Sequence, residues 1–227
     1  MKREVFFALL AATMLAGTLL RMKKYRFTPR RAVILAFLLL FGGVGGTYIL
    51  GYLEVGSWGN ISYYGSVFFV PVLMLPFSMI IKYSYTLLMD YCAPCGIAAI
   101  AVGKFHCFLN GCCGGRVLWQ NSMGEDVVFP SQLTEMAVAA VILAVLLLLE
   151  RKGRHVGKLY PLFLIMYGST RFVLNYFRDA ELVFGVIPTA GILSLAAVII
   201  GVVWLLILKK RPAAAESAAK GESKKQK

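Results

Sequence analysis

Charged side chains are scarce in this sequence, and acidic ones are the scarcest. Only 15% of the 227 residues are charged, with 11 acidic residues against 24 basic ones, while 59% are hydrophobic. This leaves too few polar side chains to cover a soluble globule of that size. The composition therefore excludes a soluble protein and indicates an integral membrane protein.

The formal net charge of +13 would suggest nucleic-acid binding in a soluble protein. Here, however, most lysines and arginines stand in short runs between apolar segments. Such runs orient membrane proteins and contact anionic headgroups. We therefore expect membrane lipids as partners and no nucleic acid.

The apolar segments are long enough to cross a bilayer. They lie at 5–20, 33–53, 64–81, 87–109, 132–149, 159–177 and 185–208. We predict an all-α integral membrane protein with about seven transmembrane helices, forming a single transmembrane helical domain over 1–208, followed by a basic cytoplasmic tail over 209–227. The first segment follows two basic residues, as a signal peptide would. It lacks a small-residue cleavage site and runs straight into a basic stretch, so we expect it to be retained as a span.

The distribution of lysine and arginine predicts the orientation. With the loop 21–32 in the cytoplasm, 18 of these residues lie inside and four outside. Because basic residues concentrate on the cytoplasmic side, we expect the N-terminus outside and the C-terminus in the cytoplasm. The loop 110–131 then lies on the outer side.

The five cysteines all lie within or beside one apolar segment, at Cys92, Cys95, Cys107, Cys112 and Cys113. An odd number in one place excludes a spread disulfide framework. A continuous helix separates Cys95 from Cys107 by about 18 Å, so one shared metal site would require a break in the helix. We expect no metal and treat Cys92 and Cys95 as packing residues. Their C-x-x-C spacing leaves a thiol-redox relay open.

Polar and reactive residues gather in one stretch, 103–116. It holds a lysine, a histidine, an asparagine, three cysteines and four glycines within fourteen positions. This composition is typical of a helix end that unwinds into a loop at the edge of an apolar layer. We expect a binding site there, reached from the outer side.

Arg171 lies in the middle of the sixth apolar segment. An uncompensated charge there costs between ~3 and more than 10 kcal/mol, so it needs a partner or an aqueous cavity. At helical spacing Arg171, Asn175 and Arg178 share one face, and with Lys104 they would suit a lipid phosphate. The alternative is structural: Arg171 pairs with Glu135 or Asp90, while Arg178 and Lys104 extend toward the membrane surface.

These residues resemble the prolipoprotein diacylglyceryl transferase family. The signature loop of that family usually reads Gly-Arg-x-Gly-Asn-Phe-x-Asn-x-Glu-x-x-Gly-Arg, and the stretch 103–116 aligns with it in register. The order and spacing agree from about 33 to 208. The other matching motifs are Ser62-Tyr63-Tyr64-Gly65, Pro130-Ser131-Gln132-Leu133-Thr134-Glu135, and Tyr167-Gly168 followed by Arg171-Phe172 and Asn175-Tyr176-Phe177-Arg178.

The resemblance implies a bacterial plasma-membrane enzyme. Members of the family move a diacylglyceryl group from phosphatidylglycerol to the lipobox cysteine thiol of a prolipoprotein and release glycerol phosphate. Such an enzyme holds the phosphate and helps the thiol to become a thiolate. We expect no cofactor, and the acceptor is a prolipoprotein lipobox peptide or a related group. The predicted phosphate-binding residues are Lys104, Arg171, Arg178, Asn175 and Gly115, and the predicted catalytic residues are His106, Asn110, Cys112 and Tyr64.

Several family residues are replaced. The loop arginine is Lys104, the loop asparagine is Cys107, the loop glutamate is Cys112, and a later glutamate is Asn175. With two acidic groups gone, we predict that His106 accepts the thiol proton, since a neutral imidazole can do so near pH 7. In the alternative route, His106 accepts the proton of Cys112, which then forms a covalent intermediate of the enzyme itself. A membrane thiol-redox or thiol-metal protein is the alternative function, and a non-catalytic lipid-binding subunit is a third.

Overall fold

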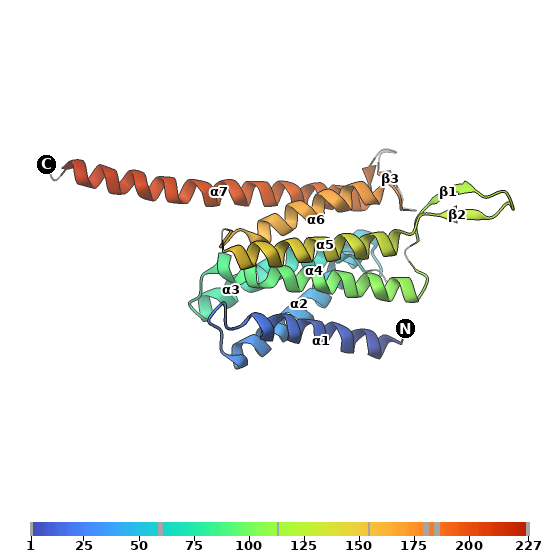
Figure 1. Cartoon of the computed structure of the whole chain (residues 1–227), viewed down its shortest axis with the longest axis horizontal. Helices are drawn as coiled ribbons and strands as arrows, with labels where there is room; N and C mark the ends of the chain where they lie inside the picture. Colours follow the sequence, from blue (N-terminus) through green and yellow to red (C-terminus); the bar gives the residue numbers. More distant parts are fainter. Residues whose placement is uncertain are drawn as a thin grey trace.

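The computed structural model describes residues 2–58, 61–112, 114–153, 155–178, 182–183 and 187–225. Within them the chain forms seven helices and two small hairpins (Figure 1), which confirms the all-α prediction. The helices are α1 (Arg3–Arg21), α2 (Pro29–Val55), α3 (Tyr63–Ile80), α4 (Tyr85–Leu109), α5 (Ser131–Lys152), α6 (Leu159–Asn175) and α7 (Thr189–Lys225). The strands are β1 (Val117–Gln120), β2 (Asp126–Val128), β3 (Leu182–Val183) and β4 (Ile187–Pro188).

In the part of the chain that the structure describes, six helices are long and apolar enough to cross a membrane. The remaining one, α6, has 17 residues, at the lower limit for a span, and packs extensively against α7. Beyond the predicted last span, α7 continues as a helix past the end of the bundle (Figure 1). The chain is therefore a multi-pass membrane protein.

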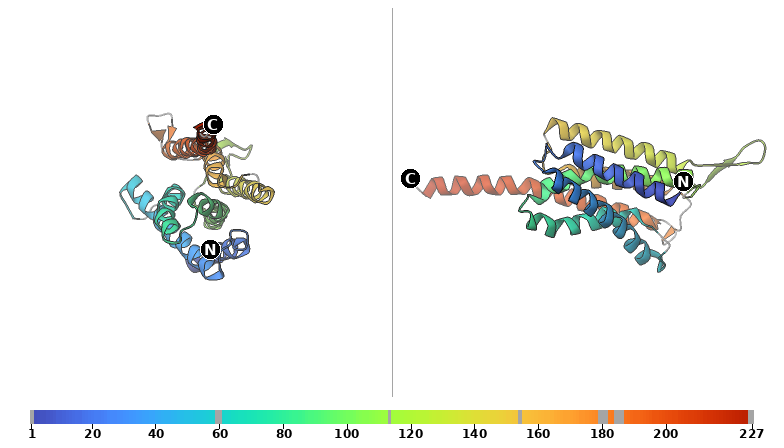
Figure 2. Two further views of the ribbon diagram at one scale, coloured as in Figure 1. Left: turned by 90° about the vertical axis from the view of Figure 1, so that its left-hand side faces the viewer. Right: turned by 90° about the horizontal axis from the view of Figure 1, so that it is seen from below.

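The connections between helices gather at two ends of the bundle (Figure 2). One end holds the N-terminus, the β1–β2 hairpin and the starts of α3, α5 and α7. The other holds the turns 22–28 and 81–84 and the loop 153–158. We call these the hairpin end and the basic end. The sequence predicts that the hairpin end faces outward and the basic end faces the cytoplasm.

Helix α4 is the centre of the bundle, packing against α1, α3, α5 and α6. It carries thirteen buried residues over its 25 positions. Beside it, α2 and α3 cross very closely where two glycines meet. A Cβ at Gly65 would lie 1.9 Å from the carbonyl oxygen of Gly46. This contact fixes the start of α3, which carries Tyr63 and Tyr64, against α2.

Candidate functional site

Three basic side chains converge on one buried carboxylate at the hairpin end. Lys104 Nζ on α4 lies 2.6 Å from Glu135 Oε2 on α5, and Arg171 Nη1 on α6 forms an ion pair with Glu135 Oε1. Arg178 Nε, just beyond α6, lies 3.8 Å from Glu135 Oε1. The Lys104 side chain is only 1% exposed and that of Glu135 6%. We call Lys104, Arg171 and Arg178 the cation cluster.

Two members of the cation cluster, Lys104 and Arg178, are held by nearby glycines. Gly103 leaves room for the ring of Tyr63, because a Cβ there would lie 2.8 Å from the Tyr63 ring. That ring covers the Lys104 ammonium at 4.9 Å from its centroid. Gly115 pairs with Arg178 in an antiparallel bridge, and a Cβ at Gly115 would lie 2.2 Å from the Phe129 carbonyl oxygen. Gly115 thus positions the backbone of Arg178.

The charges of this site do not balance. Three cations meet one carboxylate, and buried charges are costly unless they are paired and hydrogen-bonded. Among the described residues, Arg171 Nε and Tyr167 Oη are buried without a hydrogen-bond partner. Both groups border a void of about 10 Å³ that Glu135 also lines. The site therefore has unused donors and surplus positive charge, and it is closed in this conformation.

Two predicted site residues belong to a neighbouring polar contact. The Tyr64 hydroxyl donates to Ser194 Oγ at 2.6 Å, and Asn175 Nδ2 donates to the same oxygen at 3.2 Å. The Tyr64 ring also lies 5.5 Å from the ring of Tyr167. Asn175 thus shares α6 with Arg171 but is bonded toward α7. No sequence motif pointed to Ser194, since its contacts depend on how α7 packs.

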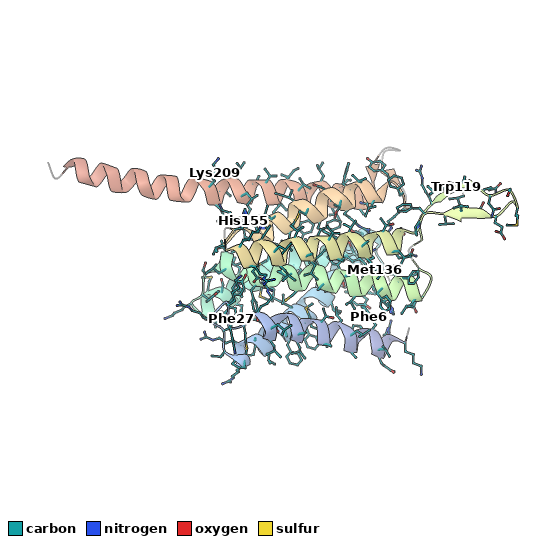
Figure 3. The ribbon with its side chains drawn as sticks, viewed as in Figure 1. Phe6, Phe27, Trp119, Met136, His155 and Lys209 are labelled. Carbon is teal, nitrogen blue, oxygen red and sulfur yellow. The ribbon has the colours of Figure 1, made fainter. Side chains whose placement is uncertain are left out.

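The other three predicted catalytic residues lie where α4 ends. The His106 ring stacks on Phe6 of α1, with centroids 4.4 Å apart, and its Nε2 lies 2.9 Å from Asn110 Nδ2 (Phe6 is labelled in Figure 3). The Cys112 thiol is 3.6 Å from the Cys107 carbonyl oxygen. Because His106 follows Lys104 by two residues on a helix, the two side chains leave α4 on different faces. The structure brings His106 and Asn110 together but points them toward α1.

The remaining cysteines pack in the core. Cys92 and Cys95 are buried and form no disulfide, and Cys95 Sγ lies 3.8 Å from Arg21 Nη1. Across the described residues, no group of three or more His, Cys, Asp or Glu side chains is arranged to hold a metal ion. Cys113 lies outside the described residues.

The structural alternative for Arg171 is found in the structure, since its partner is Glu135. Asp90 lies at the basic end instead, where its carboxylate accepts backbone N–H bonds from Leu159 at 2.7 Å and Tyr160 at 3.4 Å. From the sequence, Glu135 was predicted only as one of two possible counter-ions of Arg171 and as part of the 130–135 motif. Its position at the centre of three cations required the packing of α4, α5 and α6.

Comparison with known proteins identifies the family. The prolipoprotein diacylglyceryl transferase family matches residues 5–207. The chain is similar to the phosphatidylglycerol–prolipoprotein diacylglyceryl transferase of Yersinia enterocolitica, with 31% identity over 189 residues, covering 68% of this chain and 65% of the relative. It is 27% identical over 209 residues to the same enzyme of Mannheimia succiniciproducens, covering 79% of this chain and 78% of the relative.

The transferase of Sodalis glossinidius is 32% identical over 180 residues, covering 65% of this chain and 62% of the relative. The chain thus spans somewhat less than two thirds of the length of several curated relatives that it matches. The family match extends through all the helices that build the cation cluster. The chain therefore belongs to the prolipoprotein diacylglyceryl transferase family.

Proposed function

We propose that this protein is a membrane transferase that moves a diacylglyceryl group from phosphatidylglycerol to a cysteine thiol. The observation that carries the proposal is the convergence of Lys104, Arg171 and Arg178 on one buried anion. Phospholipids are the abundant anions at the membrane surface, and a phosphate is the leaving group of this reaction. Family membership supports the same donor.

The chemistry needs a positive site for the leaving group. The acceptor thiolate attacks the glyceryl carbon next to the phosphate, a C–S bond forms, and the C–O bond to phosphate breaks. Its electron pair leaves with glycerol phosphate, while the thiol proton passes to a base. Prearranged cations stabilise the developing negative charge without having to reorganise. The cation cluster supplies this charge, with Arg171 capable of bidentate bonds to phosphate oxygens.

The Glu135 carboxylate occupies the position in which the donor phosphate would bind. A void of about 10 Å³ cannot hold a phosphate, so donor binding requires the Glu135 carboxylate to move aside. The phosphate then replaces it as counter-ion. Arg171 Nε and Tyr167 Oη, which are buried without partners among the described residues, are donors available to its oxygens.

The acceptor is a lipobox cysteine or a related thiol. His106 and Asn110 lie at the hairpin end beside α1, and we infer that the thiol approaches from this side, with His106 as its base. A His106→Gln variant that still binds donor but has lost turnover supports this role. Unchanged turnover from mildly acidic to mildly alkaline pH would exclude it.

The function is tested by incubating the purified protein with phosphatidylglycerol and a lipobox peptide, followed by mass spectrometry. We expect a diacylglyceryl adduct on the peptide cysteine and an equal amount of glycerol phosphate. A Cys92→Ala/Cys95→Ala variant should keep this activity within a few-fold. The thiol-redox alternative is favoured by two results together. The wild type forms no adduct but catalyses thiol exchange, and the Cys92→Ala/Cys95→Ala variant loses that exchange activity. Donor binding without any adduct favours a non-catalytic lipid-binding subunit.

A further inference from the structure

A second site lies at the basic end, far from the cation cluster. A cavity of about 380 Å³ opens there between the turn after α1, the α3–α4 turn and the loop before α6. Its lining includes Lys24, Arg26, Tyr83, Leu149, His155 and Val156. Figure 3 shows His155 at the end of the bundle opposite Trp119, which lies on the hairpin.

The acidic groups that line this cavity are already engaged. Glu150 forms a buried ion pair with Arg21, at 2.7 Å from Arg21 Nη2, and its backbone oxygen accepts a bond from Lys24 Nζ. The Asp90 carboxylate accepts the backbone N–H groups of Gly157 and Leu159 at the start of α6. Arg21 neutralises the Glu150 charge and backbone N–H groups hold the Asp90 carboxylate, so the side chains left at the mouth are the cations Lys24 and Arg26.

The mouth is formed by exposed or half-exposed basic groups. Lys24 and Arg26 are exposed and His155 is half-buried. Burial raises the pKa of Tyr25 and of Tyr83 above the usual value, so both phenols stay neutral at the cavity wall. Exposed basic residues outside the cavity, such as Arg30 and Arg151, surround the same end of the bundle. An anion is therefore the preferred occupant.

The rest of the lining is apolar. Leu87, Leu149, Val156 and Leu159 all contribute to the cavity. Its volume falls within the ~300–1,000 Å³ range of ligand pockets, enough for a headgroup with its glycerol. An opening at the end of a transmembrane bundle, rimmed by cations above apolar walls, matches a phospholipid better than a water-soluble anion, because only a lipid uses both kinds of surface.

We propose that this cavity binds the headgroup of an anionic phospholipid from the leaflet at the basic end, as a site separate from the donor site. The bound lipid contacts the turn after α1, the end of α5 and the loop before α6. It thereby links α6, whose opposite end carries Arg171, to α5, whose opposite end carries Glu135. This proposal does not depend on the transfer reaction.

The test is native mass spectrometry of the purified full-length protein with phosphatidylglycerol or phosphatidylcholine. The wild type should retain two phosphatidylglycerol molecules and little phosphatidylcholine. Lys24→Ala/Arg26→Ala should retain one. Affinity at the altered cavity should weaken roughly 25-fold, because each of the two removed basic residues contributes a similar share of the free energy of binding to an anionic headgroup. The matched control, Arg30→Ala/Arg31→Ala, removes two exposed cations at the start of α2, outside the cavity, and should retain two.

Three further arms keep the outcome decisive. Arg171→Ala should lose the other lipid only, so failure at one site is distinguishable from failure at the other. His155→Glu places a negative charge at a half-exposed mouth position and should lower retention even if the double variant does not fold. Inorganic phosphate in excess should leave the lipid in place, whereas displacement would indicate a site for a free anion. Unchanged retention in both mouth variants, or equal retention of phosphatidylcholine, would overturn the proposal.

Discussion

At the scale of single residues, Glu135 governs the candidate site. Its carboxylate is the one acidic group among the described residues that pairs with Lys104, Arg171 and Arg178. We propose that it stabilises the empty site and also competes with the donor phosphate. These two effects have opposite consequences when the charge is removed, so they can be separated by one substitution.

Glu135→Gln keeps the shape of the side chain and removes its charge. We expect the lipid-free protein to lose about 3–5 kcal/mol of stability, because buried cations lose their partner. Phosphatidylglycerol should then raise the melting temperature more than it does in the wild type, because the competing carboxylate is gone. The measurement is thermal unfolding in detergent with and without the lipid. An unchanged melting temperature together with an unchanged lipid response would show that Glu135 is not the counter-ion of the site.

At the scale of elements, close helix crossings place the site residues. Gly65→Ala would push a Cβ against the backbone of Gly46, where neither helix has a flexible atom to move. We expect a loss of at least ~3 kcal/mol or a failure to fold. Gly45→Ala is the matched control, because a Cβ there meets nothing within 4 Å. Thermal unfolding of both variants is the measurement, and equal stability would argue against this crossing.

Helix positions could be predicted from the sequence because apolar runs and basic stretches mark them directly. The stripe of Arg171, Asn175 and Arg178 was predicted from helical spacing, and the two arginines pair with Glu135, as Lys104 does. The Asn175 amide instead bonds to Ser194 on α7. The spacing of residues along one helix predicts which helix face they share. It does not predict which other helix packs against that face. The ion pair of Arg21 and Glu150 could not be predicted for the same reason, because these residues are far apart in the sequence and meet only through helix packing.

At the scale of the whole molecule, the two proposed sites lie at opposite ends of the bundle. The hairpin end carries the cation cluster and the basic end carries the proposed lipid cavity. The predicted orientation puts the hairpin end outside. Reporter fusions after Lys158 and after Asn121 should therefore report opposite sides of the membrane. If both report the same side, access of an outer acceptor to the site is ruled out.

In the proposed function, the cation cluster binds the donor phosphate. Equilibrium binding of phosphatidylglycerol at the donor site tests this role, with the Arg171→Ala, Arg171→Lys and Arg151→Ala variants compared to the wild type. Arg151 is exposed at the basic end and does not line the cavity there, so it serves as the control.

We predict that Arg171→Ala loses donor binding by roughly 2–5 kcal/mol, because the phosphate then lacks its buried partner. Arg171→Lys should recover only part of this, since lysine keeps the charge but not the bidentate geometry. Arg151→Ala should bind as the wild type does. Undiminished binding by a folded Arg171→Ala variant would contradict the account, and Arg171 would then serve only to pair with Glu135.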